Sequence, residues 1–352
     1  MNHVYHEAAR LEDYICPAFT VKDGQILELN HAACYIGLTP QMSVASLLRT
    51  PEDYTLFAGG CLYLSLSVGS TDYSAAVHKE DGHDLFLLEH ELEQQLWTFS
   101  LVSQQMRGPL SEVMTAAERI LQQLPEGSSE LSANMRRSMN QLHRMACNMS
   151  DAARYSCETP IHQSTIDMAA VINEVMEKVC TLAQQHGVNI HYEPLNRIVD
   201  SLADAEKLER AVFNLMSNAL KATPAGSSIQ VSLTLSKNRL LFRVQDGGTG
   251  MSEDILSTAF SRYRRKPALS GAGQGLGLGL VIVRAVALAH GGTVLLEHPK
   301  GEGTRVTLSL AIRKDAAPKL GSPLPAIDYA GGRDHALLEL SDALPAKAYK
   351  CD

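Results

Sequence analysis

The segment GLGLG, residues 275–279, has the composition of a phosphate-binding loop. Its glycines, Gly275, Gly277 and Gly279, run directly into a predicted helix at 276–290. Glycines that open a helix leave backbone N–H groups pointing toward an anion, and the helix dipole favours negative charge at that end. A glycine run alone is a weak signal of this chemistry, so its weight depends on the rest of the chain.

A second segment, VQDGGTGM, places an acidic residue where a strand enters a glycine turn. Asp246 is followed by Gly248 and Gly250. Glycine admits positive φ and close approach of a ligand, while a carboxylate in a desolvated pocket can accept a hydrogen bond from an exocyclic amine. Taken alone, the segment is equally well explained as an ordinary strand-to-loop turn.

A predicted helix at about 204–222 carries three polar side chains on one face. Asn214, Asn218 and Lys221 follow one another in steps of four and three residues. The same helix has apolar residues for packing, so a solvated polar face is the alternative interpretation of this spacing. Two further features are the basic segment FSRYRRKPALSGAG, which could close over phosphates as a lid, and Thr304 in GEGTRVTL.

In chain order, the helix at 204–222, the VQDGGTGM turn, the basic segment and the glycine run at 275–279 resemble the N, G1, F and G2 boxes of the ATP-binding domain of sensor histidine kinases. The resemblance covers about residues 95–313. It implies ATP and Mg²⁺ as cofactors, with Asn218 as the metal ligand. It also implies that the nucleotide is bound by Asn214, Lys221, Asp246, Gly248, Gly250, Phe260, Tyr263, Gly275, Gly277, Gly279 and Thr304. In the related hydrolytic ATPases a glutamate stands four positions before the metal asparagine; here that position is Asn214, so an obvious base for fast ATP hydrolysis is missing.

Two long helices should position an acceptor for the phosphoryl group. The first has a heptad seam of Leu92, Leu96, Phe99, Ser103, Met106, Leu110, Val113, Ala117, Ile120 and Leu124. After a turn at PEGSS, the second seam is Leu131, Met135, Ser138, Leu142, Met145, Met149 and Ala152. The apolar stripes exceed what one helical hairpin can cover, which predicts pairing of two chains into a four-helix bundle.

In the family that the chain resembles, the first of these helices carries a motif like S-H-E-L-R-T-P-L, in which the histidine accepts the phosphoryl group. Aligned on Arg107 and Pro109, this chain has Gln104 at the histidine, Gln105 at the acid and Gly108 at the threonine. An amide nitrogen is neither basic nor nucleophilic, so Gln104 cannot form a phosphoramidate. The sequence therefore predicts a pseudokinase, a nucleotide-dependent regulatory protein that binds Mg-ATP or ADP without autophosphorylation.

Two alternatives stay open at this point. The first is an active kinase with another acceptor, either His90 or a residue of another protein. His90 lies 14 residues before Gln104, or roughly 21 Å along a helix at about 1.5 Å per residue, and would require a different docking of the ATP-binding domain. The second is a scaffold that has lost nucleotide binding, against which the presence of Asn218, Lys221 and Asp246 argues.

The fold class expected from these patterns is α+β with several domains. Residues 1–86 resemble a small PAS-like sensor domain, because FTVKDGQILELNHAACYIGL suggests a hairpin at Asp23-Gly24 followed by a short helix. Residues 87–160 are expected to form the dimerisation hairpin and 161–313 an α/β sandwich that binds ATP. Residues 314–352 form a tail whose short amphipathic segment, DHALLELSDALPAKAY, could dock back on the body.

Composition limits the partners and the compartment. With 31 basic and 39 acidic residues the formal charge is −8, which argues against binding to nucleic acid or to an anionic membrane. The seven cysteines are dispersed without a C-x-x-C pair, and no apolar run is long enough to cross a membrane, so a cytoplasmic location without membrane insertion is expected. The expected partners are a second copy of the chain, a histidine kinase in a mixed dimer, and a response-regulator receiver domain.

Overall fold

The computed structural model describes residues 11–14, 16–56, 60–79, 82–89, 93–123, 129–154, 164–185, 187–250, 278–299, 303–313 and 332–350. The chain divides into two compact units, Met1–Glu91 and Leu92–Asp352. The predicted domain boundaries at 160 and 313 fall within the second unit and stay predictions. In the described part of the chain no helix is both long and apolar enough to cross a membrane.

The N-terminal unit contains an antiparallel sheet with strand order β2-β1-β5-β4-β3. Its elements are η1 (Leu11–Asp13), β1 (Ala18–Lys22), β2 (Gln25–Leu29), α1 (His31–Tyr35), η2 (Val44–Ser46), α2 (Pro51–Leu56), β3 (Gly60–Val68), β4 (Thr71–Lys79) and β5 (Asp84–Glu89). The hairpin predicted at Asp23-Gly24 is confirmed, with φ of 52° and 77° at the two turn residues. The short helix that follows is also confirmed as α1. Its N-cap Asn30 accepts hydrogen bonds from the backbone of Ala18 and Ala33 and thereby ties the helix to β1.

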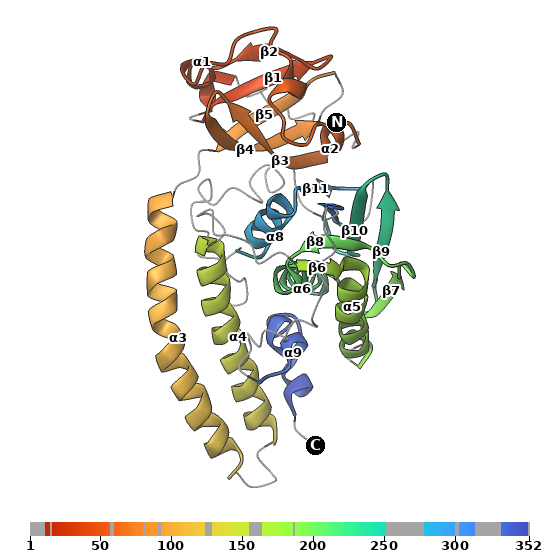
Figure 1. Cartoon of the computed structure of the whole chain (residues 1–352). Coiled ribbons are helices and arrows are strands. Elements are labelled where there is room, and N and C mark those ends of the chain that lie inside the picture. The colour runs from red at the N-terminus through yellow and green to blue at the C-terminus, as the bar shows by residue number, and fades with distance from the viewer. Residues whose placement is uncertain are drawn as a thin grey trace, which may run out of the picture. The chain divides into compact units, whose positions relative to one another are not determined.

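Two long antiparallel helices begin the second unit, α3 (Glu93–Leu121) and α4 (Ser129–Arg154) (Figure 1). Their mutual contact is a small buried cluster of Met114, Ala117, Leu121 and Met139, with Leu110 packed against it. Only part of the predicted seam lies in this contact. Seven other apolar side chains of the seam are exposed: Met106, Val113, Ile120, Leu131, Met135, Leu142 and Met145. The intrachain contact is thus shifted toward Met114 and Leu121, one position after Val113 and Ile120.

The α/β part of the second unit has a five-stranded sheet of order β11-β12-β10-β9-β7, antiparallel except for β7 and β9. The strands are β7 (Asn189–Glu193), β9 (Ser228–Ser236), β10 (Arg239–Gln245), β11 (Thr293–Glu297) and β12 (Arg305–Ala311). A two-stranded sheet of β6 (Ser164–Asp167) and β8 (Asp200–Ala203), which the periodicity did not indicate, lies beside it.

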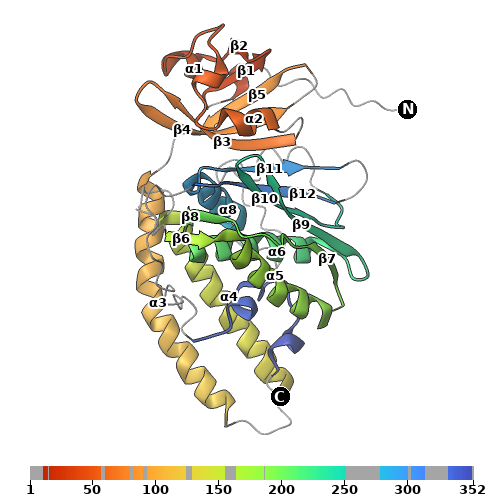
Figure 2. The same ribbon diagram turned by 45° about the vertical axis from the view of Figure 1, so that its right-hand side comes forward.

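Three helices cover one face of the larger sheet: α5 (Met168–Gln185), α6 (Ala205–Ala222) and α8 (Leu278–Ala289) (Figure 2). Ile229, Val231 and Leu233 of β9 are buried on this face, as the alternation predicts, and polar residues between them face away. The predicted α/β sandwich is confirmed for this part of the chain.

The C-terminal segment returns to the body of the second unit. It forms α9 (His335–Glu339), capped by Asp334, and the 3-10 helix η4 (Ala346–Tyr349). Leu338, Leu340 and Leu344 are almost completely buried, and the segment contacts α4, α5 and α6. The prediction that the amphipathic segment docks on the body is confirmed.

Candidate nucleotide-binding site

The polar face of α6 meets the first turn of α8. A Cβ atom at Gly279 would lie 3.0 Å from Oδ1 of Asn214 and 3.6 Å from Nδ2 of Asn218. A side chain at 279 would crowd the Asn214 amide, whereas its Cβ would only be in van der Waals contact with Asn218. The structure therefore brings together two asparagines and one glycine that the sequence grouped only by motif order.

Asn214 is buried and held on both sides of its amide. Its Nδ2 donates to the carbonyl of Arg210 at 2.9 Å, and its Oδ1 accepts from Nη2 of Arg144 at 3.2 Å. Asn218, one turn later, is half-buried beside Gly279. Its amide is the better placed of the two for a ligand that reaches the N-terminus of α8.

Asp246 and Thr304 form one unit at the ends of β10 and β12. Oδ1 of Asp246 accepts from the backbone N–H groups of Gly248 and Thr304, each at 3.0 Å, and the Asp246 N–H donates to the Thr304 carbonyl. The carboxylate is 8% exposed. Because Oδ1 already accepts from two backbone N–H groups, Oδ2 is the oxygen that could accept a hydrogen bond from the amino group of a base.

The glycine turn after Asp246 packs against the end of α6. A Cβ at Gly248 would come within 2.6 Å of the carbonyl oxygen of Ala222, and Gly250 has φ of 77°. Both positions require glycine, for close approach and for positive φ respectively. This packing places the Asp246 unit next to the helix that carries Asn218 and Lys221.

Four of the predicted site residues, Phe260, Tyr263, Gly275 and Gly277, lie outside the described residues, as does the predicted lid. Among the described residues, no group of three or more histidine, cysteine, aspartate and glutamate side chains could hold a metal ion by itself. A metal here would need ligands from the amide of Asn218 and from a bound anion.

His290 and the two glycines after it close α8. Nε2 of His290 accepts from the Asp204 N–H at 3.0 Å, and Nδ1 donates to the Val286 carbonyl at 2.8 Å. Burial lowers the pKa of His290, in keeping with a neutral ring whose Nε2 accepts a hydrogen bond. Gly292 is required because a Cβ there would overlap the Ser309 carbonyl. The histidine therefore fixes the start of α6 against the end of α8.

Two side chains that the sequence did not indicate reach the polar face of α6. Arg144 of α4 donates from Nη1 to Oγ of Ser217 at 3.0 Å as well as to Asn214. Asp342 of the C-terminal segment accepts from Nζ of Lys221 at 3.0 Å. Burial lowers the pKa of Lys221, against the opposing effect of Asp342. Because these residues lie about 70 and 120 positions from their partners, no local spacing could have revealed them.

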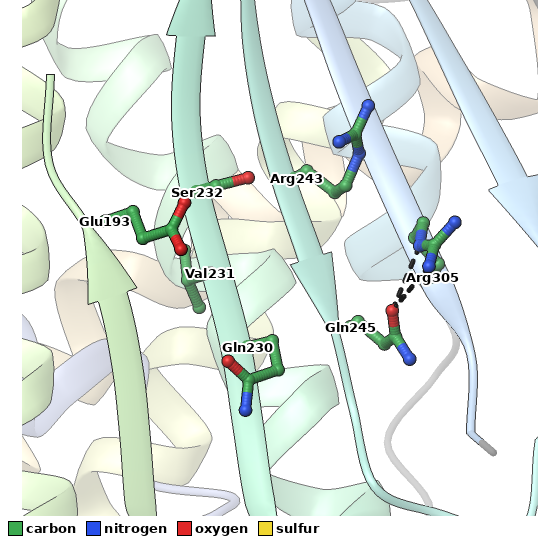
Figure 3. A pocket seen from close by; sticks show the side chains of 7 residues that line it. All are labelled: Glu193, Gln230, Val231, Ser232, Arg243, Gln245 and Arg305. Carbon is green, nitrogen blue, oxygen red and sulfur yellow. Dashed lines mark hydrogen bonds between the residues drawn. The ribbon is translucent and has the colours of Figure 1, made fainter.

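A shallow hollow of about 200 Å³ lies on the other face of the sheet (Figure 3). It is lined by Glu193, Gln230, Val231, Ser232, Arg243, Gln245 and Arg305. Arg305 donates to Oε1 of Gln245 from Nε at 3.1 Å and from Nη2 at 2.8 Å. Since none of its lining residues belongs to the predicted site, this hollow is separate from it.

The acceptor motif lies within the continuous helix α3, which runs through Pro109. Gln105 and Gly108 are exposed. A Cβ added at Gly108 would meet no described atom within 4 Å, so the space for a threonine is present. The loss of the hydroxyl is therefore not explained by packing within the described part of this chain.

The fold and the grouped motifs define a class, the ATPase domains that histidine kinases share with gyrase B and HSP90. Residues 203–314 match the family model described as histidine kinase-, DNA gyrase B-, and HSP90-like ATPase. The sensor histidine kinase ZraS of Escherichia coli (strain K12) is 26% identical over 219 residues, which are 61% of this chain and 45% of ZraS. The sensor protein SrrB of Staphylococcus aureus (strain NCTC 8325) is 26% identical over 228 residues, 63% of this chain and 39% of SrrB. The chain is thus similar to sensor histidine kinases, and its residues 203–314 match the ATPase domain of that kind.

One solved structure supports the fold. The crystal structure of full-length ShkA in complex with AMPPNP aligns with a TM-score of 0.50 at 24% identity, covering 65% of this chain and 48% of that chain. The present chain spans less than half the length of these curated relatives.

Proposed function

We propose that this protein is a nucleotide-dependent regulatory member of the histidine kinase family, a pseudokinase that binds Mg-ATP or ADP and does not autophosphorylate. The proposal rests on the contrast between the nucleotide site and the acceptor position. The N-box helix, the Asp246 turn and Gly279 are assembled as a nucleotide site requires, whereas the acceptor position in α3 is Gln104.

The described residues fit a magnesium nucleotide. Oδ2 of Asp246 would accept from the adenine amino group, and the first turn of α8 would face the phosphates. Mg²⁺ is commonly held by one or two protein ligands together with phosphate oxygens and water, so Asn218 alone is a sufficient protein contribution. When bound, the ion would neutralise phosphate charge; Asn218 would fix its position.

Phosphoryl transfer to α3 fails on chemical grounds. The amide nitrogen of Gln104 has its lone pair delocalised into the carbonyl, Gln105 supplies no carboxylate base, and Gly108 supplies no hydroxyl to orient water. The nucleotide would then act through its differential affinity for two arrangements of the ATPase domain and the helical hairpin.

The proposal is tested by measuring Mg-ATP binding and phosphotransfer on one preparation of the full chain. We expect saturable binding and no acid-labile, base-stable label on the chain after incubation with γ-labelled ATP. Labelled histidine would instead establish the alternative, an active kinase that uses His90 or another acceptor. Absence of binding would leave a scaffold and contradict the proposal.

We also propose a homodimer, or a mixed dimer with a histidine kinase, formed through the exposed seam of α3 and α4. Val113 and Leu131 are 63% and 65% exposed, and Leu142 is 53% exposed. Such a run of large apolar side chains on a helical hairpin is typical of a surface that a partner covers. A response-regulator receiver domain, a PAS-like role for residues 1–86 and a cytoplasmic location stay predictions from the sequence.

We predict that Val113→Glu converts the dimer to a monomer. A charge at the centre of the bundle would have to be desolvated without a partner, which should weaken association at least tenfold. Size-exclusion chromatography with light scattering measures this. Thr115→Glu is the matched control, because Thr115 has the same shape and an exposed position on the same helix but lies off the seam. Equal masses for both variants would contradict the proposed interface.

A further inference from the structure

The C-terminal segment 332–350 is bound between α4 and the N-box helix α6 rather than lying free on the surface (Figures 1 and 2). Leu338 and Leu340 are completely buried, and Tyr349 donates from its hydroxyl to the Leu337 carbonyl at 2.8 Å. Burial of this apolar surface gives the segment a defined docked conformation.

Its acidic residues join both helices through charge. Glu339 is fully buried; Oε2 accepts from Nε of Arg144 on α4 at 3.2 Å, and Oε1 lies 3.4 Å from Nε of Arg210 on α6. Asp151 of α4 pairs with Arg210 as well. The cluster matches three cations with three anions: Arg144, Arg210 and Lys221 with Asp151, Glu339 and Asp342.

Asp342 is the carboxylate of this cluster that contacts a residue of the candidate site. Its Oδ2 accepts from Nη1 of Arg144 at 2.8 Å and from Nζ of Lys221 at 3.0 Å. Arg144 also holds Oδ1 of Asn214. One carboxylate and one guanidinium from outside the ATPase fold therefore engage two N-box residues of the proposed site, Asn214 and Lys221, of which Lys221 is expected to contact the phosphates.

We infer that segment 332–350 is an intramolecular clamp that competes with the phosphates of a nucleotide for Lys221 and so links nucleotide occupancy to the contact between α4 and the ATPase domain. The inference rests on the proposed nucleotide site. An ammonium held by a carboxylate is less available to a phosphate, and two ligands that exclude each other at one group weaken each other's binding equally.

The clamp also links nucleotide binding to the contact between α4 and α6. Glu339 and Asp342 lie on one short segment, so loss of the Asp342 contacts loosens the segment that also joins Arg144 to Arg210. Bound nucleotide would favour the arrangement in which segment 332–350 is released and α4 is freer to move against α6. Absence of nucleotide would favour the docked arrangement seen here.

The test compares Asp342→Asn with the unchanged full chain. Asp342 is 27% exposed in its side chain and Arg144 keeps Glu339 in the variant, so the fold should persist. We expect the Kd for Mg-ATP, measured by calorimetry, to fall about three- to tenfold, the range for one partly exposed contact linked to a binding site. Glu297→Gln is the matched control; it removes a carboxylate that is 31% exposed and pairs with Arg305 on the other sheet face.

Hydrogen–deuterium exchange supplies a second measurement. Saturating Mg-ATP should speed exchange in 332–350 of the unchanged chain at least severalfold. Equal affinity of the unchanged chain and Asp342→Asn, with exchange unaltered at saturation, would overturn the clamp while leaving the nucleotide site intact. Failure of both proteins to bind nucleotide would overturn the proposed function, and the clamp with it.

Discussion

Asp246→Asn is expected to weaken ATP binding by about 10- to 100-fold, which corresponds to about 1.5–3 kcal/mol for a hydrogen bond to a charged group. In the structure Oδ1 accepts from two backbone N–H groups, and an asparagine oxygen can do the same. The substituted NH₂ group then takes the place of Oδ2. It would present a donor to the donor amino group of adenine, so the contact becomes repulsive while the local fold is kept.

Isothermal titration of the full-length variant with Mg-ATP measures this effect. Asp200→Asn is the control, since Asp200 is an exposed aspartate on β8 of the same unit and has no place in the site. Both variants should melt within a degree or two of the unchanged protein. An unaltered ATP affinity for Asp246→Asn would show that the Asp246 carboxylate does not bind the adenine amino group.

Local periodicity predicted most of the second unit. Besides the helix at 204–222, the apolar pattern predicts a helix at 168–186 and a hairpin that turns at Lys237-Asn238. They appear as α6, α5 and β9–β10, with helix bounds within one or two residues. These elements are specified by apolar repeats of 3.6 and 2 residues and by turn residues, all of which are local properties. The short strands β6 and β8 escaped prediction because four residues are too few to show a period.

The residues of the candidate site were likewise only partly predictable from local sequence. Asn218, Asp246 and Gly279 could be placed by motif because each lies next to a helix or strand end that the sequence marks. Arg144 and Asp342 could not, since their roles depend on how α4 and the C-terminal segment pack against α6. An arginine within a helix or an aspartate in a tail most often faces solvent. Only the tertiary contacts show that these two side chains belong to a site.

Glu339→Gln is expected to destabilise the second unit by about 3 kcal/mol, in the range for breaking a buried ion pair by removing one partner. Glu339 is 0% exposed and lies against two guanidiniums that are themselves buried, Arg144 and Arg210. Glutamine preserves the shape of the side chain but turns an NH₂ donor toward one arginine. Asp151 and Asp342 would then face three cations, so one positive charge would remain buried without compensation.

The loss should appear as a fall in melting temperature of about 6–12 °C for a unit of this size. Glu297→Gln again serves as the comparison, because an exposed pair contributes only about 0–1 kcal/mol. If segment 332–350 undocks before the unit melts, the loss of stability is limited to the docking free energy, and hydrogen exchange would then rise in that segment with little change in melting. Either outcome assigns the charge cluster a structural role in docking. Unchanged melting together with unchanged exchange would show that Glu339 does not hold α4 to α6, and that the position of the C-terminal segment depends on its apolar side chains alone.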